Sequence, residues 1–153
     1  MIKTNFIVMS HYALSAYTKV CRPVCQKYDI SQTSLDILVF LADNKGLDTA
    51  KDICANTGIK KNLVSMNVEK LVEGEFLKRE NDPLDRRVVH LVITSKADPV
   101  IEKGREIKKY FKEAFIKDID EEEYRIYRKC IEKITDNIDE LYHEINSRED
   151  MFN

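Results

Sequence analysis

The chain has 153 residues, of which 43% are hydrophobic and 34% are charged, and its formal net charge is −2. This balance is typical of a folded globular protein and excludes a disordered chain, while the length suits one domain rather than a multidomain enzyme. No run approaches the roughly 20 apolar residues of a membrane span, and no signal-peptide pattern opens the sequence, so we expect a cytoplasmic protein without a membrane partner. Its four cysteines are then expected to be reduced thiols.

The segment from Phe6 to Tyr28 has apolar residues at three- and four-residue spacing, which predicts an amphipathic helix. Pro23 is expected to kink this helix or to end its regular part, because proline lacks a backbone donor. Ser31 is a suitable N-cap, and a second helix is predicted after it, with Leu35 and Leu38 on its inner face.

Two short helices are predicted next, at about residues 49–56 and 60–73, and Gly58 lies between them. The inward apolar positions of the second of these helices are Val64, Val68 and Leu71. Two short helices joined by a glycine-containing turn predict a helix-turn-helix, although the pattern alone is common.

A β-hairpin is predicted directly after the helix-turn-helix. Residues 76–79 and 88–93 have the composition of strands, and residues 81–85 between them are dense in turn formers. Arg86 and Arg87 fall at the tip of this hairpin. A hairpin with a basic tip after a helix-turn-helix is the arrangement called a wing, so the middle of the chain is predicted to be a winged helix.

The rest of the chain returns to helix, at about residues 95–115 and 121–145. The second helix carries a long apolar stripe of Tyr124, Tyr127, Ile131, Ile134, Ile138, Leu141 and Ile145. Such a stripe on a terminal helix needs a partner helix to cover it, and a second copy of the chain is the simplest source of that helix. Acidic residues concentrate in this segment, whereas Lys and Arg outnumber Asp and Glu between Lys60 and Lys96, so the middle of the chain is the part suited to phosphates.

The hairpin also carries a family resemblance. Asp82-Pro83-Leu84-Asp85-Arg86-Arg87, followed by an apolar strand and Ile93-Thr94, resembles the wing of the MarR family of transcriptional regulators. The resemblance covers nearly the whole chain and implies one domain over residues 1–153, mainly α with a small β-hairpin. It implies a winged helix-turn-helix DNA-binding lobe at residues 31–94, plus a helical dimerisation lobe at residues 1–30 and 95–148. Lys60-Lys61-Asn62 replaces the small hydroxyl residues usual in the family, so the operator sequence does not transfer.

In this interpretation the helix at residues 60–73 reads the major groove of double-stranded DNA, where each base pair presents a distinct pattern of donors and acceptors. Asn62, Ser65 and Met66 lie opposite the apolar stripe and are the candidate base contacts. Lys60 and Lys61 are better suited to phosphates, which fix the position of the protein without reading sequence. The alternative is that all five are solvated residues on an ordinary helix.

Arg86 and Arg87 are the candidate wing contacts, because an arginine at a hairpin tip can enter the narrow minor groove of A·T-rich DNA. Asp85 is interpreted as an orienting residue that pairs with one of these arginines and holds the tip in shape. We expect Arg86 to insert and Arg87 to pair with Asp85. The reverse assignment and a purely structural hairpin stay open.

Cys21 and Cys25 share a helix face, and we expect them to be buried small hydrophobes near the dimer interface. A thiol- or metal-responsive regulator that uses both cysteines is the alternative, although Arg22 is the only nearby cation that favours a thiolate. The histidines, at positions 11, 90 and 143, are scattered and are expected to be solvated or packed. No metal site and no other cofactor is predicted.

The predicted function is a sequence-specific, ligand-responsive transcriptional regulator, a repressor that acts as a homodimer on a pseudo-palindromic operator. The family resemblance implies a pocket for a small aromatic or phenolic effector, with Tyr12, Tyr17 and Tyr28 as its candidate lining, although their helical spacing also fits a plain core. An enzyme is disfavoured because no nucleophile–base spacing, phosphate-cradling glycine loop or metal-ligand cluster is present. A winged-helix dimer that serves protein interactions stays an alternative because the net charge is negative.

Overall fold

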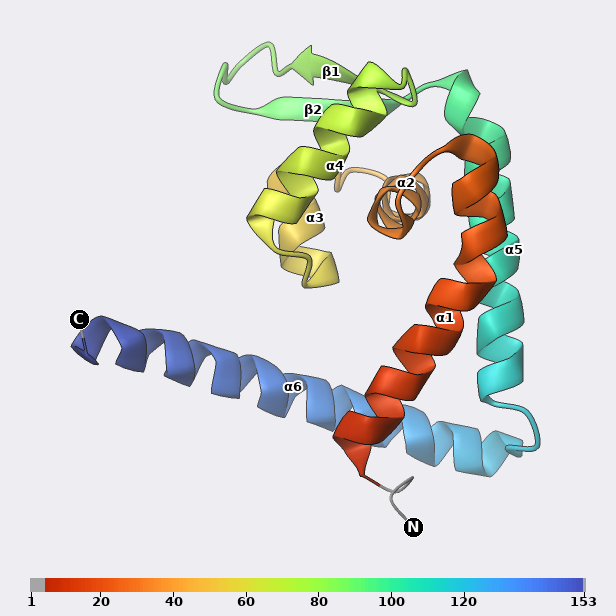
Figure 1. The fold of residues 1–153 in the computed structure, drawn as a ribbon. Helices are drawn as coiled ribbons and strands as arrows, with labels where there is room; N and C mark the ends of the chain where they lie inside the picture. Colours follow the sequence, from red (N-terminus) through yellow and green to blue (C-terminus); the bar gives the residue numbers. More distant parts are fainter. Residues whose placement is uncertain (1–4, 153) are drawn as a thin grey trace. The chain divides into compact units, whose positions relative to one another are not determined.

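The computed structural model describes the backbone of residues 5–152 and the side chains of residues 5–145 (Figure 1). It is mainly helical with one two-stranded hairpin, so the predicted fold class is confirmed. The chain divides into two compact units within α5, one ending at Lys112 and the other beginning at Glu113. Residues 1–4 and the side chains of residues 146–148, which the sequence assigns to dimerisation, lie outside the described residues.

The elements of the first unit follow the predicted order (Figure 1). They are α1 (Phe6–Tyr28), α2 (Gln32–Asp43), α3 (Ala50–Thr57), α4 (Lys61–Glu73), β1 (Leu77–Asn81) and β2 (Val89–Ile93). A 3-10 turn at Ser95–Ala97 leads into α5 (Asp98–Phe115), and α6 (Glu121–Phe152) follows in the second unit. The helix predicted from residue 95 therefore begins three residues later, with Pro99 in its first turn, where the missing N–H of proline removes no helical bond.

α1 continues through Pro23 to Tyr28, so the alternative in which proline ends the helix is wrong. Proline removes one hydrogen bond of a 23-residue helix, and the turns around it are held by the packing of Cys21, Val24 and Cys25 against the core. The helix ends at Asp29, which adopts the left-handed conformation (φ 51°) and donates its N–H to the carbonyl of Cys25.

α2 is the central helix of the first unit, and its buried residues contact α1, α3, α4 and β2. The predicted inward residues of α4, Val64, Val68 and Leu71, are at most 3% exposed. On α5, a Cβ added to Gly104 would lie 2.5 Å from Cγ2 of Val39, so α2 and α5 approach each other at a distance that only glycine permits.

One polar side chain is fully bonded inside this core. Asn67 of α4 is 2% exposed, and its Oδ1 accepts hydrogen bonds from the hydroxyl groups of Ser31, at 2.5 Å, and Ser34, at 2.9 Å. Its Nδ2 donates to the carbonyl of Leu63 at 2.8 Å. Ser31 is also the N-cap of α2. The middle of α4 is therefore joined to the start of α2 by a polar contact as well as by apolar packing.

The second unit is dominated by α6. Near its start, Tyr124 and Tyr127 stack with ring centroids 6.1 Å apart, and Tyr127 also contacts Phe115, at 6.4 Å. Further along the helix, Ile134, Ile138, Leu141 and Ile145 are each 39–53% exposed. Most of the predicted apolar stripe is thus uncovered in a single chain.

None of the described helices is both long enough and apolar enough to cross a membrane.

Candidate nucleic-acid interface

The outward face of α4 carries the predicted base contacts. Asn62, Ser65 and Met66 are all exposed on the side opposite the buried Val64 and Val68. Leu63, which the sequence analysis did not single out, is also 39% exposed beside them. This face offers one amide, one hydroxyl and two apolar side chains, which is the set of groups that base edges and thymine methyls can contact.

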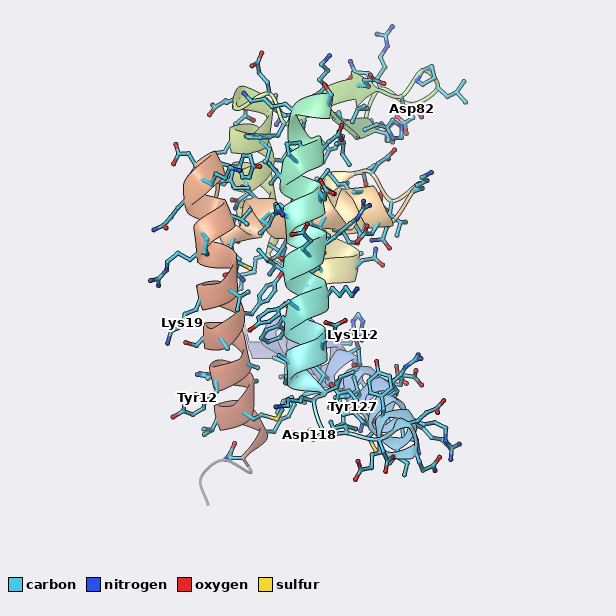
Figure 2. The ribbon with its side chains drawn as sticks, turned by 90° about the vertical axis from the view of Figure 1, so that its right-hand side faces the viewer. Tyr12, Lys19, Asp82, Lys112, Asp118 and Tyr127 are labelled. Carbon is cyan, nitrogen blue, oxygen red and sulfur yellow. The ribbon has the colours of Figure 1, made fainter. Side chains whose placement is uncertain are left out.

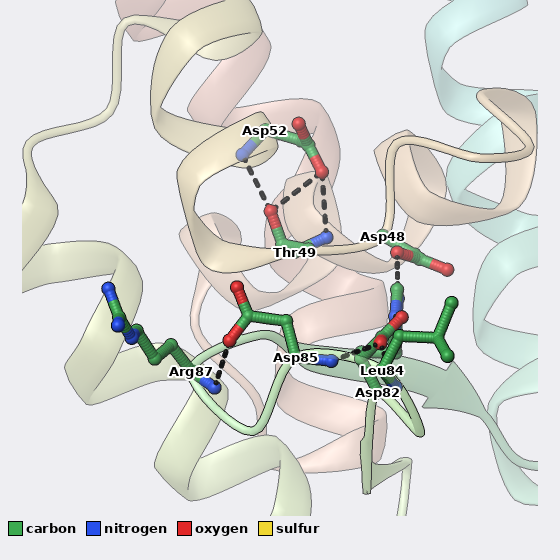
Figure 3. A network of polar contacts seen from close by, with 8 residues as sticks. Asp48, Thr49, Asp52, Asp82, Leu84, Asp85 and Arg87 are labelled. Atoms are coloured by element: carbon green, nitrogen blue, oxygen red, sulfur yellow. Dashed lines mark hydrogen bonds and ion pairs between the residues drawn. The ribbon is translucent and has the colours of Figure 1, made fainter.

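Lys60 and Lys61 lie at the start of α4, and both are exposed. Lys60 occupies the N-cap position, and its side chain accepts no hydrogen bond from the first N–H groups of the helix. By contrast, α3 begins with a reciprocal capping box between Thr49 and Asp52 (Figure 3). The first backbone N–H groups of α4 are therefore left for solvent or for an anion, and two ammonium groups stand beside them.

The wing turn is organised by the carboxylates of Asp82 and Asp85 (Figure 3). Asp82 Oδ1 accepts hydrogen bonds from the backbone N–H groups of Leu84, at 2.7 Å, and Asp85, at 2.8 Å. The turn closes where Asp82 N–H donates to the carbonyl of Val88 at 3.1 Å. These hydrogen bonds lower the pKa of Asp82, so the carboxylate stays ionised around neutral pH.

Asp85 meets Arg87 in a way that differs from the expected side-chain pairing. Its Oδ1 accepts a hydrogen bond from the backbone N–H of Arg87 at 2.9 Å, and Figure 3 shows the Arg87 side chain extending away from it. A carboxylate two residues before an N–H readily closes such a turn, because both groups belong to the same short loop. Arg86 and Arg87 are both exposed at the tip, and Leu84 between the two carboxylates is 96% exposed.

His90 is a wing residue whose contacts the sequence analysis missed. Its Nδ1 lies 2.7 Å from Oδ1 of Asp48, in the loop before α3, and its Nε2 lies 3.2 Å from Oδ2 of Asp82. The hydrogen bond to Asp48 is the largest cause that raises the pKa of His90 above its ordinary value, and the hydrogen bond to Asp82 is the next. The sequence alone gives little indication of these contacts, because a histidine in a predicted strand does not show which loop, here more than forty residues earlier, will lie beside it.

The three tyrosines proposed for an effector pocket are not brought together. Tyr12 is 69% exposed and projects outward from α1 (Figure 2). Tyr17 is packed, with its hydroxyl donating to Oδ1 of Asp36 at 2.7 Å and its ring edge-on to Phe111 at 5.2 Å. Burial is the main cause of the raised pKa of the Tyr17 hydroxyl, and the hydrogen bond to Asp36 raises it further. Tyr28 is the only one of the three that lines a described hollow.

That hollow has a volume of about 780 Å³ and lies between the end of α1, the start of α2 and the end of α4. Its apolar wall includes Tyr28, Leu71 and Phe76. Its basic residues are Lys27, Lys70 and Lys96, against one carboxylate, Asp29. Three ammonium groups around an aromatic wall suit a small organic anion.

The cysteines have the properties of packed thiols. Cys21 is fully buried and Cys25 is half-buried, and neither forms a disulfide. Burial raises the pKa of Cys21 to about 11 and also raises that of Cys25, which opposes formation of the reactive thiolate. Within the described part of the chain, no three His, Cys, Asp or Glu side chains are grouped in a way that could hold a metal ion.

A helix-turn-helix followed by a hairpin with an exposed basic turn defines a winged-helix protein. The model of the MarR family matches residues 28–88, from the end of α1 to the wing turn. A relative, the HTH-type transcriptional regulator BilQ of Clostridium symbiosum, is 22% identical over 118 residues, which cover 77% of this chain and 81% of BilQ.

Two solved structures show the same fold at low identity. A MarR-family regulator from Listeria monocytogenes, complexed with a 26mer DNA, has a TM-score of 0.80 and 13% identity, covering 88% of this chain and 89% of its own. Bordetella bronchiseptica BpsR, described for the regulation of its DNA binding by 6-hydroxynicotinic acid, has a TM-score of 0.71 and 15% identity, covering 89% and 96%. The winged-helix part of the chain, residues 28–88, thus matches the MarR family, and the chain as a whole is similar to transcriptional regulators of that family, which are not enzymes.

Proposed function

We propose that the protein is a homodimeric repressor that binds a pseudo-palindromic operator and releases it when a small ligand binds. The observation that carries the proposal is the pairing of two exposed surfaces, the outward face of α4 and the arginine-bearing wing turn, on one winged helix. The Listeria monocytogenes relative, which has the same fold, is described in complex with DNA. The similarity to transcriptional regulators supports double-stranded DNA as the target of these surfaces.

The two surfaces would contact different parts of the DNA. Asn62, Ser65 and Met66 would contact base edges in the major groove, while Lys60 and Lys61 would contact phosphates beside the exposed start of α4. The wing turn would place Arg86 in the adjacent minor groove, where a narrow A·T-rich groove concentrates negative potential. The acidic net charge does not oppose this arrangement, because the acidic residues gather in α6 and the residues before it.

Dimerisation is supported by the apolar side chains that a single chain leaves uncovered. On α6 these include Ile134, Ile138 and Leu141, and the first half of α1 adds Phe6 and Ile7, which are 51% and 64% exposed. On each of these helices, the large apolar side chains left exposed are more numerous than the scattered single residues usual on a monomer's surface. A two-fold dimer would present two recognition helices to half-sites about one helical turn apart, roughly 10 base pairs.

The lysine-lined hollow supports ligand response. BpsR is described as regulated by 6-hydroxynicotinic acid, an aromatic acid, and the hollow of this chain combines an aromatic wall with three ammonium groups. Lys70 and Leu71 belong to α4, so an anion held between them and Lys27 of α1 would act directly on the recognition helix. Such a ligand alters DNA affinity only if it binds the free and DNA-bound arrangements of α4 unequally.

A salt-titrated gel shift with DNA upstream of the protein's own gene tests the proposal. We expect specific retention of that DNA over a scrambled sequence, with affinity falling linearly on a log–log plot against salt because Lys and Arg displace counterions. An Arg86→Ala, Arg87→Ala double variant with intact circular dichroism is the matched control. Retention of the operator by this control as tightly as by the wild type would contradict the wing contact. Failure of the folded wild type to bind any DNA would favour the protein-interaction alternative.

A further inference from the structure

His90 stands where the wing meets the helix-turn-helix. It lies on β2, and its two ring nitrogens contact Asp48, at 2.7 Å, and Asp82, at 3.2 Å. Asp48 belongs to the loop between α2 and α3, and Asp82 is the first residue of the wing turn. One imidazole therefore contacts both the loop before α3 and the wing turn.

Both carboxylates belong to residues that hold the local backbone. The carbonyl of Asp48 accepts the N–H of Leu91 at 2.8 Å, and Thr49 forms an isolated β-bridge with His90, so the loop before α3 runs beside β2. Asp82 offers one oxygen to His90 and the other to the N–H groups of Leu84 and Asp85. A change at His90 is thus transmitted through a single carboxylate to the backbone that carries Arg86.

The two contacts have a chemical requirement. A neutral imidazole has one N–H and can donate to only one carboxylate, whereas an imidazolium has two and can donate to both. Because the acceptor on each side is an ionisable carboxylate, the bridge from Asp48 to Asp82 is complete only in the protonated form. Loss of the proton leaves one ring nitrogen as an acceptor facing a carboxylate oxygen, which is repulsive.

The charges that face His90 are mostly negative. Besides Asp48 and Asp82, Glu80 is its cross-strand partner on β1, and Asp52 of α3 interacts with it through space. Lys51, next to Asp52, is the cation that acts on that carboxylate. This surrounding is consistent with the raised pKa of His90, whose main cause is the hydrogen bond to Asp48.

We propose that the His90 imidazolium is a positioning residue for DNA binding, which fixes the wing turn against the loop before α3 so that Arg86 is held where the minor groove needs it. The inference rests on the proposed DNA-binding function. It extends that function by making the operator affinity depend on one proton at a residue outside the proposed DNA contacts.

The sign of the pH effect follows from linkage. Since the pKa of His90 is raised in the folded state, the bridge is fully present below its ordinary pKa and is lost as the pH rises through the raised one. Operator affinity should therefore be highest near pH 6 and fall toward pH 9 at constant salt. We expect a change of about two- to fivefold, the range for a solvent-accessible ion pair.

The experiment combines operator titrations from pH 6 to 9 with NMR titration of the His90 ring. At every pH from 6 to 9, His90→Gln should bind the operator as weakly as the wild type does at pH 9. His90→Lys should bind the operator at every pH with nearly the affinity that the wild type has at pH 6. Asp48→Asn should move the midpoint of both titrations to lower pH. His11→Gln, which changes an exposed histidine on α1, is the matched control and should keep the wild-type profile.

A second measurement needs no DNA and separates this inference from the proposed function. Hydrogen-exchange protection factors of the Leu84, Asp85 and Arg87 amides should fall in the wild type between pH 6 and 9, and should be low at both pH values in His90→Gln. If no DNA is bound but protection changes in this way, the positioning role stands and the proposed function fails. Unchanged protection, or a His90→Gln variant that keeps the wild-type pH profile, would overturn the inference.

Discussion

Glu69 on α4 binds Arg79 on β1, with Oε2 of the carboxylate 2.7 Å from one guanidinium nitrogen and Oε1 3.5 Å from another. The hydrogen bond between them lowers the pKa of Glu69 and raises that of Arg79, so both are charged at neutral pH. The pair links α4 to β1 and engages the guanidinium of Arg79 with a carboxylate.

Glu69→Gln should therefore strengthen non-specific DNA binding. The substitution removes a negative charge from the DNA-facing side of α4 and frees Arg79 for a phosphate, so the slope of log affinity against log salt should steepen by about one unit. Titration with random-sequence DNA at several salt concentrations measures this change. Glu73→Gln removes the same charge near the end of the same helix and should leave the slope closer to that of the wild type.

In the wing, Arg86→Ala should weaken operator binding by about 1–3 kcal/mol and relax the preference for A·T-rich flanks, because a charge held in the minor groove is lost. The salt slope should fall by about one unit. Competition titrations with operators whose flanks are A·T-rich or G·C-rich supply the measurement. Equal affinities of the wild type and this variant for both operators would remove Arg86 from the interface.

The two wing carboxylates should differ in their importance. Asp82→Ala removes the acceptor of two backbone N–H groups and of His90, whereas Asp85→Ala removes the acceptor of one N–H group. Both variants should bind the operator more weakly with nearly unchanged salt slopes, since no phosphate contact is lost, and Asp82→Ala should be the weaker of the two. The interpretation would need revision if Asp85→Ala proved the more damaging.

The stripe on α6 should be an oligomer contact. Ile138→Glu places a charge on a side chain that is 48% exposed in the single chain, and we expect the sedimentation coefficient at micromolar concentration to shift from that of a dimer to that of a monomer. Asp136→Asn lies on the opposite side of the same helix and should leave the coefficient unchanged. A monomeric wild type would exclude the dimer directly.

The cysteines should be dispensable for regulation. With the pKa of Cys21 raised to about 11 by burial, the thiol stays protonated at neutral pH and reacts slowly with oxidants. Replacing Cys21 and Cys25 by Ala should preserve operator affinity in gel shifts with and without peroxide, at a cost of about 1 kcal/mol in stability. A peroxide effect that disappears in the double variant would restore the thiol-sensing alternative.

Periodicity accounts for most of the agreement between sequence and structure. Val64, Val68 and Leu71 are spaced to share one helix face, and a spacing of this kind fixes burial without knowledge of the partner helix. The wing was predicted because turn formers and basic residues are adjacent in sequence. Local patterns of this type specify local structure.

Two of the contacts that the sequence did not reveal join groups on different elements. His90 meets Asp48, and Tyr17 meets Asp36 rather than sharing a pocket with Tyr28. Asp85 bonds to a backbone N–H where a guanidinium was expected, because two donors of the same residue compete and sequence alone does not rank them. The contacts between elements are set by tertiary packing, which local sequence patterns do not specify.

The buried amide of Asn67 has a consequence for the angle at which α4 is turned about its own axis. A helix advances about 100° per residue, so a slip by one position would swing Asn62 and Ser65 well away from a bound duplex. Apolar packing of Val64, Val68 and Leu71 opposes such a slip, because the slip would bring Ser65 and Glu69 into the core. The amide of Asn67 adds a directional constraint, because a rotated helix would bury it without its two serine hydroxyl partners. The buried Asn67 thus helps to fix the rotation of α4, and with it the direction of the side chains proposed to contact DNA.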